Sequence, residues 1–146
     1  MSTQAQPVVV EKVINAPVSR VWKAITNHAE IQKWYFQMPA FEPKKGFHFT
    51  FEGRSEGQVF THLCTITEVI ENKKLQHTWS FKEFKGMSTV TWELTDMGGK
   101  TKVTLTHTGL ETFGDVPALA RKNFEAGWTA IIGTNLPKFV ESEARS

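Results

Sequence analysis

The stretch from Asp115 to Glu141 constrains the fold of this chain most, because no other long segment has clear helical periodicity. Asp115 can accept hydrogen bonds from the first turn, and Pro117 lies where a missing N–H costs nothing. A helix of this length crosses a whole small domain and needs a large apolar partner. One stripe of this helix is formed by residues at steps of three and four, namely Phe124, Trp128, Ile131, Ile132, Asn135 and Phe139.

Three residues disturb this helical pattern. Gly127 and Gly133 each cost about 1 kcal/mol relative to alanine in a helix interior, which indicates close backbone approach or bending. The ring of Pro137 meets the carbonyl four residues back, which belongs to Gly133. The sequence therefore predicts a kink near Gly133.

Length and composition indicate one domain over 1–146, with an ordered core at about 8–140. The chain has 17 basic and 15 acidic residues and one cysteine. This balance lacks the dense basic patch that nucleic-acid binding needs, and a single cysteine forms no internal disulfide. The first residues lack a signal-peptide pattern, and no segment has the length of a membrane span. We expect a cytoplasmic protein that does not cross a membrane.

The segment before the long helix predicts mostly antiparallel strands. Residues 8–14 form a β-branched run, and short helical patterns follow around 18–25 and 31–34. From Lys44 the period changes to two, with turn residues between five successive runs. The sequence thus predicts an α+β fold, in which a curved antiparallel sheet of six or seven strands wraps around the C-terminal helix.

The aromatic content is high for a chain of this length, with 11 Phe, 5 Trp and 1 Tyr. Alternation directs many of these rings to the inner face of the sheet, opposite the helix. Such rings can line a ligand cavity or interlock as a packed core, and both interpretations remain open here. The aromatic and apolar residues predicted to contact a ligand are Trp34, Tyr35, Phe36, Phe49, Phe51, Phe60, Trp79, Trp92, Phe124, Trp128 and Ile131.

Three histidines, His62, His77 and His107, share the predicted inner face. They can contact a ligand, bind Zn²⁺, act as general bases or form ordinary core hydrogen bonds. Their spacing forms no compact metal motif, and no acidic residue shares their face to orient an imidazole. Cys64 is a poor nucleophilic partner for His62, and Ser80 and Ser88 are predicted to face outward. We therefore assign no catalytic residue, metal or cofactor, and add the three histidines to the ligand-binding set.

Several segments resemble the helix-grip superfamily of START lipid-transfer domains, plant allergen-type carriers and polyketide cyclases, and most closely its branch similar to the activator of the heat-shock-protein-90 ATPase. The resemblance implies the helix-grip fold, a stress-response context and either ligand binding or a chaperone-type protein partner. The matching segments are Ile14-Asn15-Ala16-Pro17 with Val21-Trp22, Lys33-Trp34-Tyr35-Phe36, Gly46-Phe47-His48-Phe49, Lys74 to Trp79, Thr89 to Leu94, Thr106 to Leu110, and Gly127-Trp128.

These observations leave three hypotheses for function. The first is a non-catalytic domain that holds a small hydrophobic or aromatic ligand between the sheet and the C-terminal helix. The second is a co-chaperone-type module that binds a protein partner through an exposed apolar patch. The third is a cyclase or hydrolase that uses an inward histidine as a base, which requires that histidine to be oriented and reachable.

Overall fold

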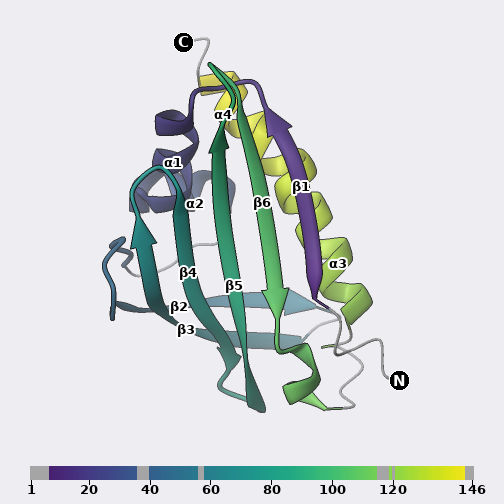
Figure 1. Cartoon of the computed structure of the whole chain (residues 1–146). Helices are drawn as coiled ribbons and strands as arrows, with labels where there is room; N and C mark the ends of the chain where they lie inside the picture. Colours follow the sequence, from purple (N-terminus) through teal and green to yellow (C-terminus); the bar gives the residue numbers. More distant parts are fainter. Residues whose placement is uncertain (1–6, 36–39, 56–57, 115–118, 120, 144–146) are drawn as a thin grey trace.

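The computed structural model describes residues 7–35, 40–55, 58–114, 119 and 121–143 (Figure 1). The predicted α+β order is confirmed, with two short helices after the first strand and a helical segment at the C-terminal end. The elements are β1 (Val8–Ile14), α1 (Val18–Thr26), α2 (His28–Trp34), β2 (His48–Ser55), β3 (Gln58–Ile70), β4 (Lys74–Phe81), β5 (Phe84–Asp96), β6 (Thr101–Thr108), the 3₁₀ turn η2 (Leu110–Phe113), α3 (Arg121–Ala130), the π turn η4 (Ile131–Asn135) and α4 (Leu136–Glu143).

The sheet has six antiparallel strands in the order β1-β6-β5-β4-β3-β2. The first strand pairs with the last, since Val8 lies opposite His107 and Ile14 opposite Thr101. The register shifts between Ile66 and Glu68 in β3, and again in β4. Such irregularities bend and twist a strand. In Figure 1, β2 and β3 accordingly cross the direction of β5 and β6, so the sheet is strongly curved.

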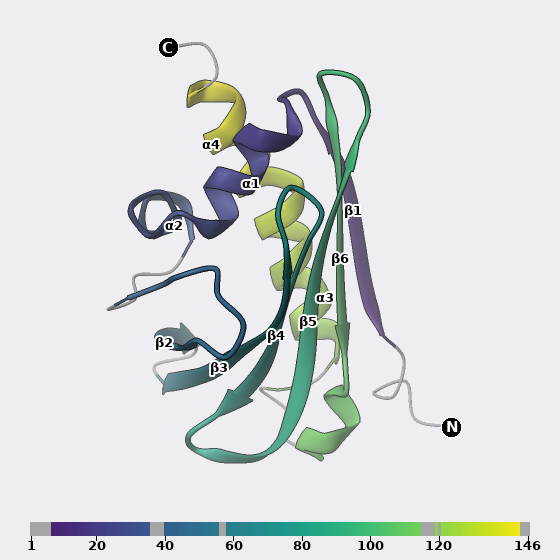
Figure 2. The ribbon, with the colours of Figure 1, turned by 60° about the vertical axis from the view of Figure 1, so that its left-hand side comes forward.

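All four α-helices lie on the same side of this sheet (Figure 2). The C-terminal helical segment passes beside β1, and α1 contacts both α4 and β5. The curved sheet therefore encloses the apolar face of the C-terminal segment, which is the helix-grip arrangement. None of the helices among the described residues is long and apolar enough to cross a membrane.

Near Gly133, where a kink is predicted, the helix contains a π turn. The N–H of Leu136 donates to the carbonyl oxygen of Ile131, five residues back. Pro137 follows directly, where it has no N–H to complete an α-helical bond to Gly133. The predicted helix start at Asp115 and Pro117 lies outside the described residues, and α3 begins at Arg121.

The π turn changes which residues face the sheet, and the predicted stripe is wrong at Asn135. Trp128 and Ile132 are buried as expected and Phe139 is half-buried against the core, but Asn135 is exposed. The buried positions that follow are Leu136, Pro137 and Val140. A π turn takes up one more residue than an α turn, so every later position rotates by one place.

Of the two alternatives predicted for the glycines, close backbone approach or bending, close approach is found at neither. A Cβ atom built on Gly127 or on Gly133 meets no atom within 4 Å. Gly127 is exposed in the interior of α3, where it contributes only conformational freedom to the unfolded chain.

We expect Gly127→Ala to raise the free energy of unfolding by about 0.5–1 kcal/mol, because alanine restricts the unfolded chain and fits the helix. Urea denaturation measures the change. Gly109→Ala is the matched control: Gly109 has a φ of 83°, and a Cβ there would lie 3.2 Å from the carbonyl oxygen of Met87, so the same substitution should destabilise. A loss of stability in Gly127→Ala would contradict an open, exposed helix position.

Candidate ligand-binding site

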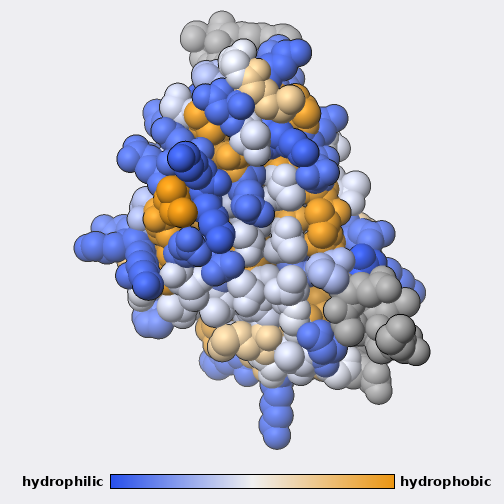
Figure 3. All heavy atoms as spheres, in the orientation of Figure 1, coloured by the Kyte–Doolittle hydropathy of each residue, from blue (hydrophilic) through white to orange (hydrophobic). Residues whose placement is uncertain are grey.

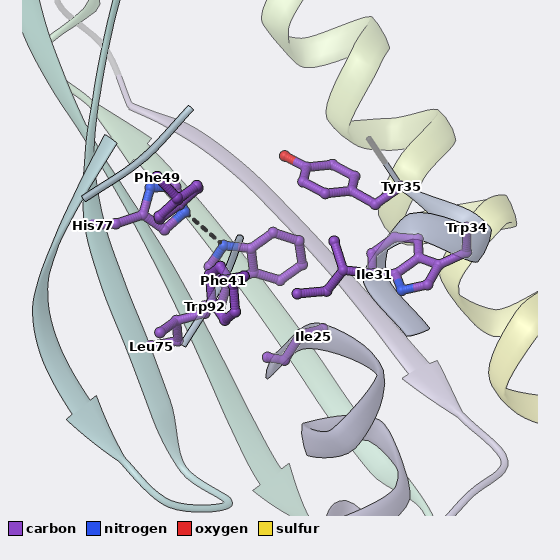
Figure 4. A pocket seen from close by; sticks show the side chains of 9 residues that line it. All are labelled: Ile25, Ile31, Trp34, Tyr35, Phe41, Phe49, Leu75, His77 and Trp92. Carbon is purple, nitrogen blue, oxygen red and sulfur yellow. Dashed lines mark hydrogen bonds between the residues drawn. The ribbon is translucent and has the colours of Figure 1, made fainter. Parts of the chain in front are cut away.

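An apolar pocket lies between the two short helices and the sheet (Figure 4). Figure 4 shows its side chains converging from α1 and α2 on one side and from the strands on the other. The space open to the centres of water-sized spheres is about 20 Å³, which is room for one water molecule. The lining residues are Ile25, Ile31, Trp34, Tyr35, Phe41, Phe49, Leu75, His77 and Trp92.

The helix α2 brings Trp34 and Tyr35 to this pocket, and several contacts fix its position. The side chain of Asn27 accepts a hydrogen bond from the N–H of Glu30 and caps the first turn. The buried carboxylate of Glu30 lies 2.6 Å from Nη1 of Arg20 in α1. The indole N–H of Trp34 donates to the carbonyl oxygen of Ala24 at 2.8 Å. These contacts join α2 to α1.

The ring of Tyr35 lies among the aromatic rings of the sheet and the C-terminal helix. It stacks on Trp128 with an angle of 24° between the ring planes and a centroid distance of 6.4 Å. It stands perpendicular to Trp92 at 6.1 Å and tilted against Phe51 at 5.9 Å. Tyr35 thus connects the pocket to α3. Among the described residues, none of α3 lines the pocket itself.

His77 is the one imidazole among the described residues of the pocket wall, and both of its ring nitrogens have hydrogen-bond partners. The indole N–H of Trp92 donates to Nε2 at 3.2 Å. Nδ1 therefore carries the proton and donates to the carbonyl oxygen of Thr78 at 2.9 Å. Burial lowers the pKa of His77 to about 4, against the opposing effect of the Thr78 carbonyl. The ring is neutral at pH 7.

His107 forms a second buried network, in which Ser88 takes part. Trp128 donates to Nδ1 at 3.0 Å, so Nε2 carries the proton and donates to Oγ of Ser88 at 2.7 Å. The hydroxyl of Ser88 then donates to the carbonyl oxygen of Trp79 at 2.8 Å. Burial, and secondarily the proximity of His77, lower the pKa of His107 to about 3.

The prediction that Ser88 faces outward is therefore wrong. Ser88 is buried and shares the inner face with Val90 and Trp92, which have the same strand parity. The contact of Ser88 with His107 resembles a catalytic dyad, but its direction is reversed. A general base accepts the serine proton, whereas His107 donates to this serine because Trp128 occupies its other nitrogen.

His62 packs among the aromatic rings beside the pocket. Its ring stacks on Phe51 at 4.4 Å, with 11° between the planes, and Nδ1 lies 3.3 Å from the carbonyl oxygen of that residue. A Cβ on Gly53 would lie 2.9 Å from Cε1 of His62, so glycine makes room for the ring. Burial lowers the pKa of His62 to about 4. Burial also raises the pKa of the neighbouring Cys64 thiol, which disfavours a reactive thiolate.

The structure divides the predicted ligand-contacting residues into two groups. Trp34, Tyr35, Phe49, His77 and Trp92 line the pocket. A second group packs beside it as an aromatic array, and Phe36 lies outside the described residues. This second group consists of Phe51, Phe60, His62, Trp79, His107, Phe124 and Trp128, with Ile131 packed against the core.

Four pocket residues were missing from the predicted set. Ile25 and Ile31 lie on the apolar faces of the two predicted short helices, and Leu75 has the same parity as His77, so the pattern could have included them. Phe41 precedes the period-two region and has no such signal. Among the residues that the structure describes, no three His, Cys, Asp or Glu side chains are grouped to hold a metal ion.

The buried histidines predict how stability depends on pH. Their folded-state pKa values of about 3 to 4 lie below the ordinary value of 6.5, so the unfolded chain binds more protons between these limits. The free energy of unfolding is therefore expected to fall as the pH decreases from about 6.5 to about 4, at up to about 1.4 kcal/mol per pH unit for each histidine.

The substitution His107→Phe should reduce the slope of the free energy of unfolding against pH by the contribution of one proton. Urea denaturation at several pH values measures this slope. Leu105→Ala, a buried neighbour on the same strand, is the control for destabilisation alone. Its curve should lie lower than that of the wild type but run parallel to it. An unchanged slope in His107→Phe would contradict a neutral, buried His107.

Solved structures from other organisms share this fold. Protein MLL2253 from Mesorhizobium loti is 26% identical, with a TM-score of 0.74 over 94% of this chain and 98% of its own. A protein from Arthrobacter aurescens is 15% identical, with a TM-score of 0.80 over 97% and 90% of the two chains. DynU16, from the dynemicin biosynthetic locus, is 23% identical with a TM-score of 0.76 over 94% of this chain. The chain spans about half of DynU16, 48% of its length.

The sequence was also compared with known families and with the curated proteins. A search of the curated proteins gives no match. Residues 15–141, nearly the whole chain, match the family described as activator of Hsp90 ATPase homolog 1-like protein. This chain belongs to that family.

Proposed function

We propose that this domain is a non-catalytic binding domain for a small hydrophobic or aromatic ligand, held at the pocket between the short helices and the sheet. The observation that carries the proposal is the composition of the pocket wall, in which eight of the nine lining residues that the structure describes are apolar or aromatic. The ninth, His77, is neutral and already hydrogen-bonded through both ring nitrogens. Such a wall favours an uncharged, largely apolar ligand.

The small volume of the pocket means that a ligand must displace a side chain to enter. Side-chain rotation on binding is common in otherwise preformed sites. Trp34 and Tyr35 are only half-buried, whereas Phe49, Leu75 and Trp92 are buried on strands. The α2 end of the pocket is therefore the side that can yield. The membership of the family, whose helix-grip fold includes ligand carriers, supports the same proposal.

For the alternative of a histidine-dependent enzyme, two of the three candidate histidines have no free ring nitrogen to act as a base. His77 and His107 each use one nitrogen to accept an indole proton and the other to donate. Either ring must break an existing hydrogen bond before it can take a proton from a substrate.

The alternative of a protein-partner module has its exposed large hydrophobic residues spread over several parts of the described structure. They are Val9 and Val13 on β1, Val59, Leu63 and Ile70 on β3, Met87 on β5, and Met97 after β5. Three strands, β6, β5 and β4, separate β1 from β3 in the sheet. On the face of the molecule that is turned to the viewer in Figure 1, Figure 3 shows separate hydrophobic spots divided by polar residues.

Binding of the uncharged apolar dye N-phenyl-1-naphthylamine tests the proposal with a matched pair of variants. Leu75 and Leu105 lie opposite Trp92 on its two neighbouring strands, but only Leu75 lines the pocket. Leu75→Phe should fill the pocket and weaken dye binding by about tenfold or more, whereas Leu105→Phe should bind as the wild type does. Both variants overpack the core at a cost of about 1–3 kcal/mol.

Fluorescence titration of folded protein, with cooperative urea unfolding as a check on each variant, measures the dye affinity. The wild type should bind at one saturable site with a change in tryptophan emission. Equal affinities in the two variants, or no saturable binding by the wild type, would remove the pocket as the ligand site.

A further inference from the structure

The side chain of Tyr35 occupies a slot shaped for one planar ring. Trp128 forms its parallel wall, and Trp92 forms a wall perpendicular to the ring. Phe51 closes a third side. Stacked and edge-on contacts of this kind favour an aromatic ring over an aliphatic group of equal size. The three walls come from the C-terminal helix and two strands, so they stay in place if Tyr35 moves.

The position of Tyr35 in the chain allows its side chain to rotate without loss of the backbone hydrogen bond that ends α2. Tyr35 is the residue that directly follows α2, and its backbone angles, φ −116° and ψ −128°, are not helical. Its N–H donates to the carbonyl oxygen of Ile31, a bond that rotation of the side chain does not break. The residue is half-buried and belongs to the pocket wall. Of the rings around Trp128, it is the one held by a helix end instead of a strand or helix interior.

A hydrogen-bond donor lies in the same group of rings. The indole N–H groups of Trp34, Trp92 and Trp128 donate to Ala24, His77 and His107. The buried N–H of Trp79 has no acceptor among the described residues. Buried donors are seldom left in this state without a functional reason. The ring of Trp79 contacts Phe51 at 5.4 Å and Trp128 at 5.4 Å, two of the three rings that form the Tyr35 slot.

From these observations we propose that the slot filled by Tyr35 is the binding subsite for one planar aromatic ring that carries a hydrogen-bond acceptor, with Trp79 as the donor to that acceptor. This inference rests on the proposed ligand-binding function and specifies the ligand class. In the ligand-free protein Tyr35 acts as an internal substitute for the ligand ring. A ligand can bind only to molecules in which Tyr35 has left the slot. The apparent affinity for the ligand is therefore reduced in proportion to the fraction of such molecules.

Two small molecules of the same skeleton test the ligand class. The ketone 1-indanone carries a carbonyl acceptor and no donor, and indane carries neither. Tyr35→Ala should bind 1-indanone about tenfold or more tightly than the wild type does, because the internal competitor is gone. It should also prefer 1-indanone to indane by about tenfold, the value of one buried hydrogen bond. The additional change Trp79→Phe should remove this preference.

Phe113→Ala is the control for a cavity made elsewhere in the aromatic core. Phe113 is buried against Phe81 and Phe124, away from the slot. Titration calorimetry compares the variants. If Phe113→Ala binds 1-indanone as tightly as Tyr35→Ala, or if the preference over indane survives Trp79→Phe, the assigned subsite is wrong.

Chemical modification of the wild type provides a second test that needs no variant. Tyr35 is the only tyrosine of the chain, so nitration by tetranitromethane reports on this residue alone among tyrosines. Saturating 1-indanone should raise the nitration rate of Tyr35 several-fold, because the displaced ring becomes accessible. Saturable 1-indanone binding without faster nitration would overturn the displacement of Tyr35. In that case, dye binding that still depends on Leu75 would leave the proposed binding function intact.

Discussion

The contact of the Trp128 indole with the inner face of the sheet is the interaction on which the rest of this structure depends. Its ring contacts Tyr35, Trp79, Trp92 and His107, which come from α2 and from three strands. Its N–H fixes the tautomer of His107 and, through it, the hydrogen bond to Ser88. One side chain thus joins the C-terminal helix to the aromatic array and to the buried polar network. Because that network is fully paired, it can be buried without a large energetic cost.

The same interaction accounts for the properties of the candidate site. Trp128 and the strands hold the rings that surround Tyr35, while α2 is joined to α1 through the Glu30 ion pair and the Trp34 hydrogen bond. The histidines stay neutral because burial in an apolar interior disfavours the charged imidazolium and lowers their pKa, against the opposing effect of the backbone carbonyls at His62 and His77. The result is a rigid aromatic wall beside a partly exposed helix end. This arrangement suits recognition of an apolar ring better than proton transfer.

Alternation along the strands was enough to predict the order of elements and most of the inner face, including His77, Trp79 and Trp92. The same alternation places Ser88 with Val90 and Trp92 on the inner face, so the predicted outward orientation of Ser88 did not follow the parity of its strand. The exposure of Asn135 could not be predicted from periodicity, because a π turn adds one residue to the helix and only Gly133 and Pro137 hint at it. The extent of the pocket could not be predicted either. Parity determines which face a ring occupies, whereas the side-chain rotamers decide whether rings such as Phe41 and Tyr35 fill the space between the layers.

The free energy of unfolding of Trp128→Ala, measured by urea denaturation, tests the central role of this indole most directly. We expect a loss of about 3–5 kcal/mol, because the substitution removes a buried ring and also leaves His107 without its donor. Trp22→Ala is a suitable comparison, because Trp22 is a buried tryptophan of α1. The described structure gives no ring contact between Trp22 and Trp128. A loss below about 1 kcal/mol in Trp128→Ala would contradict the packing of the C-terminal helix described here.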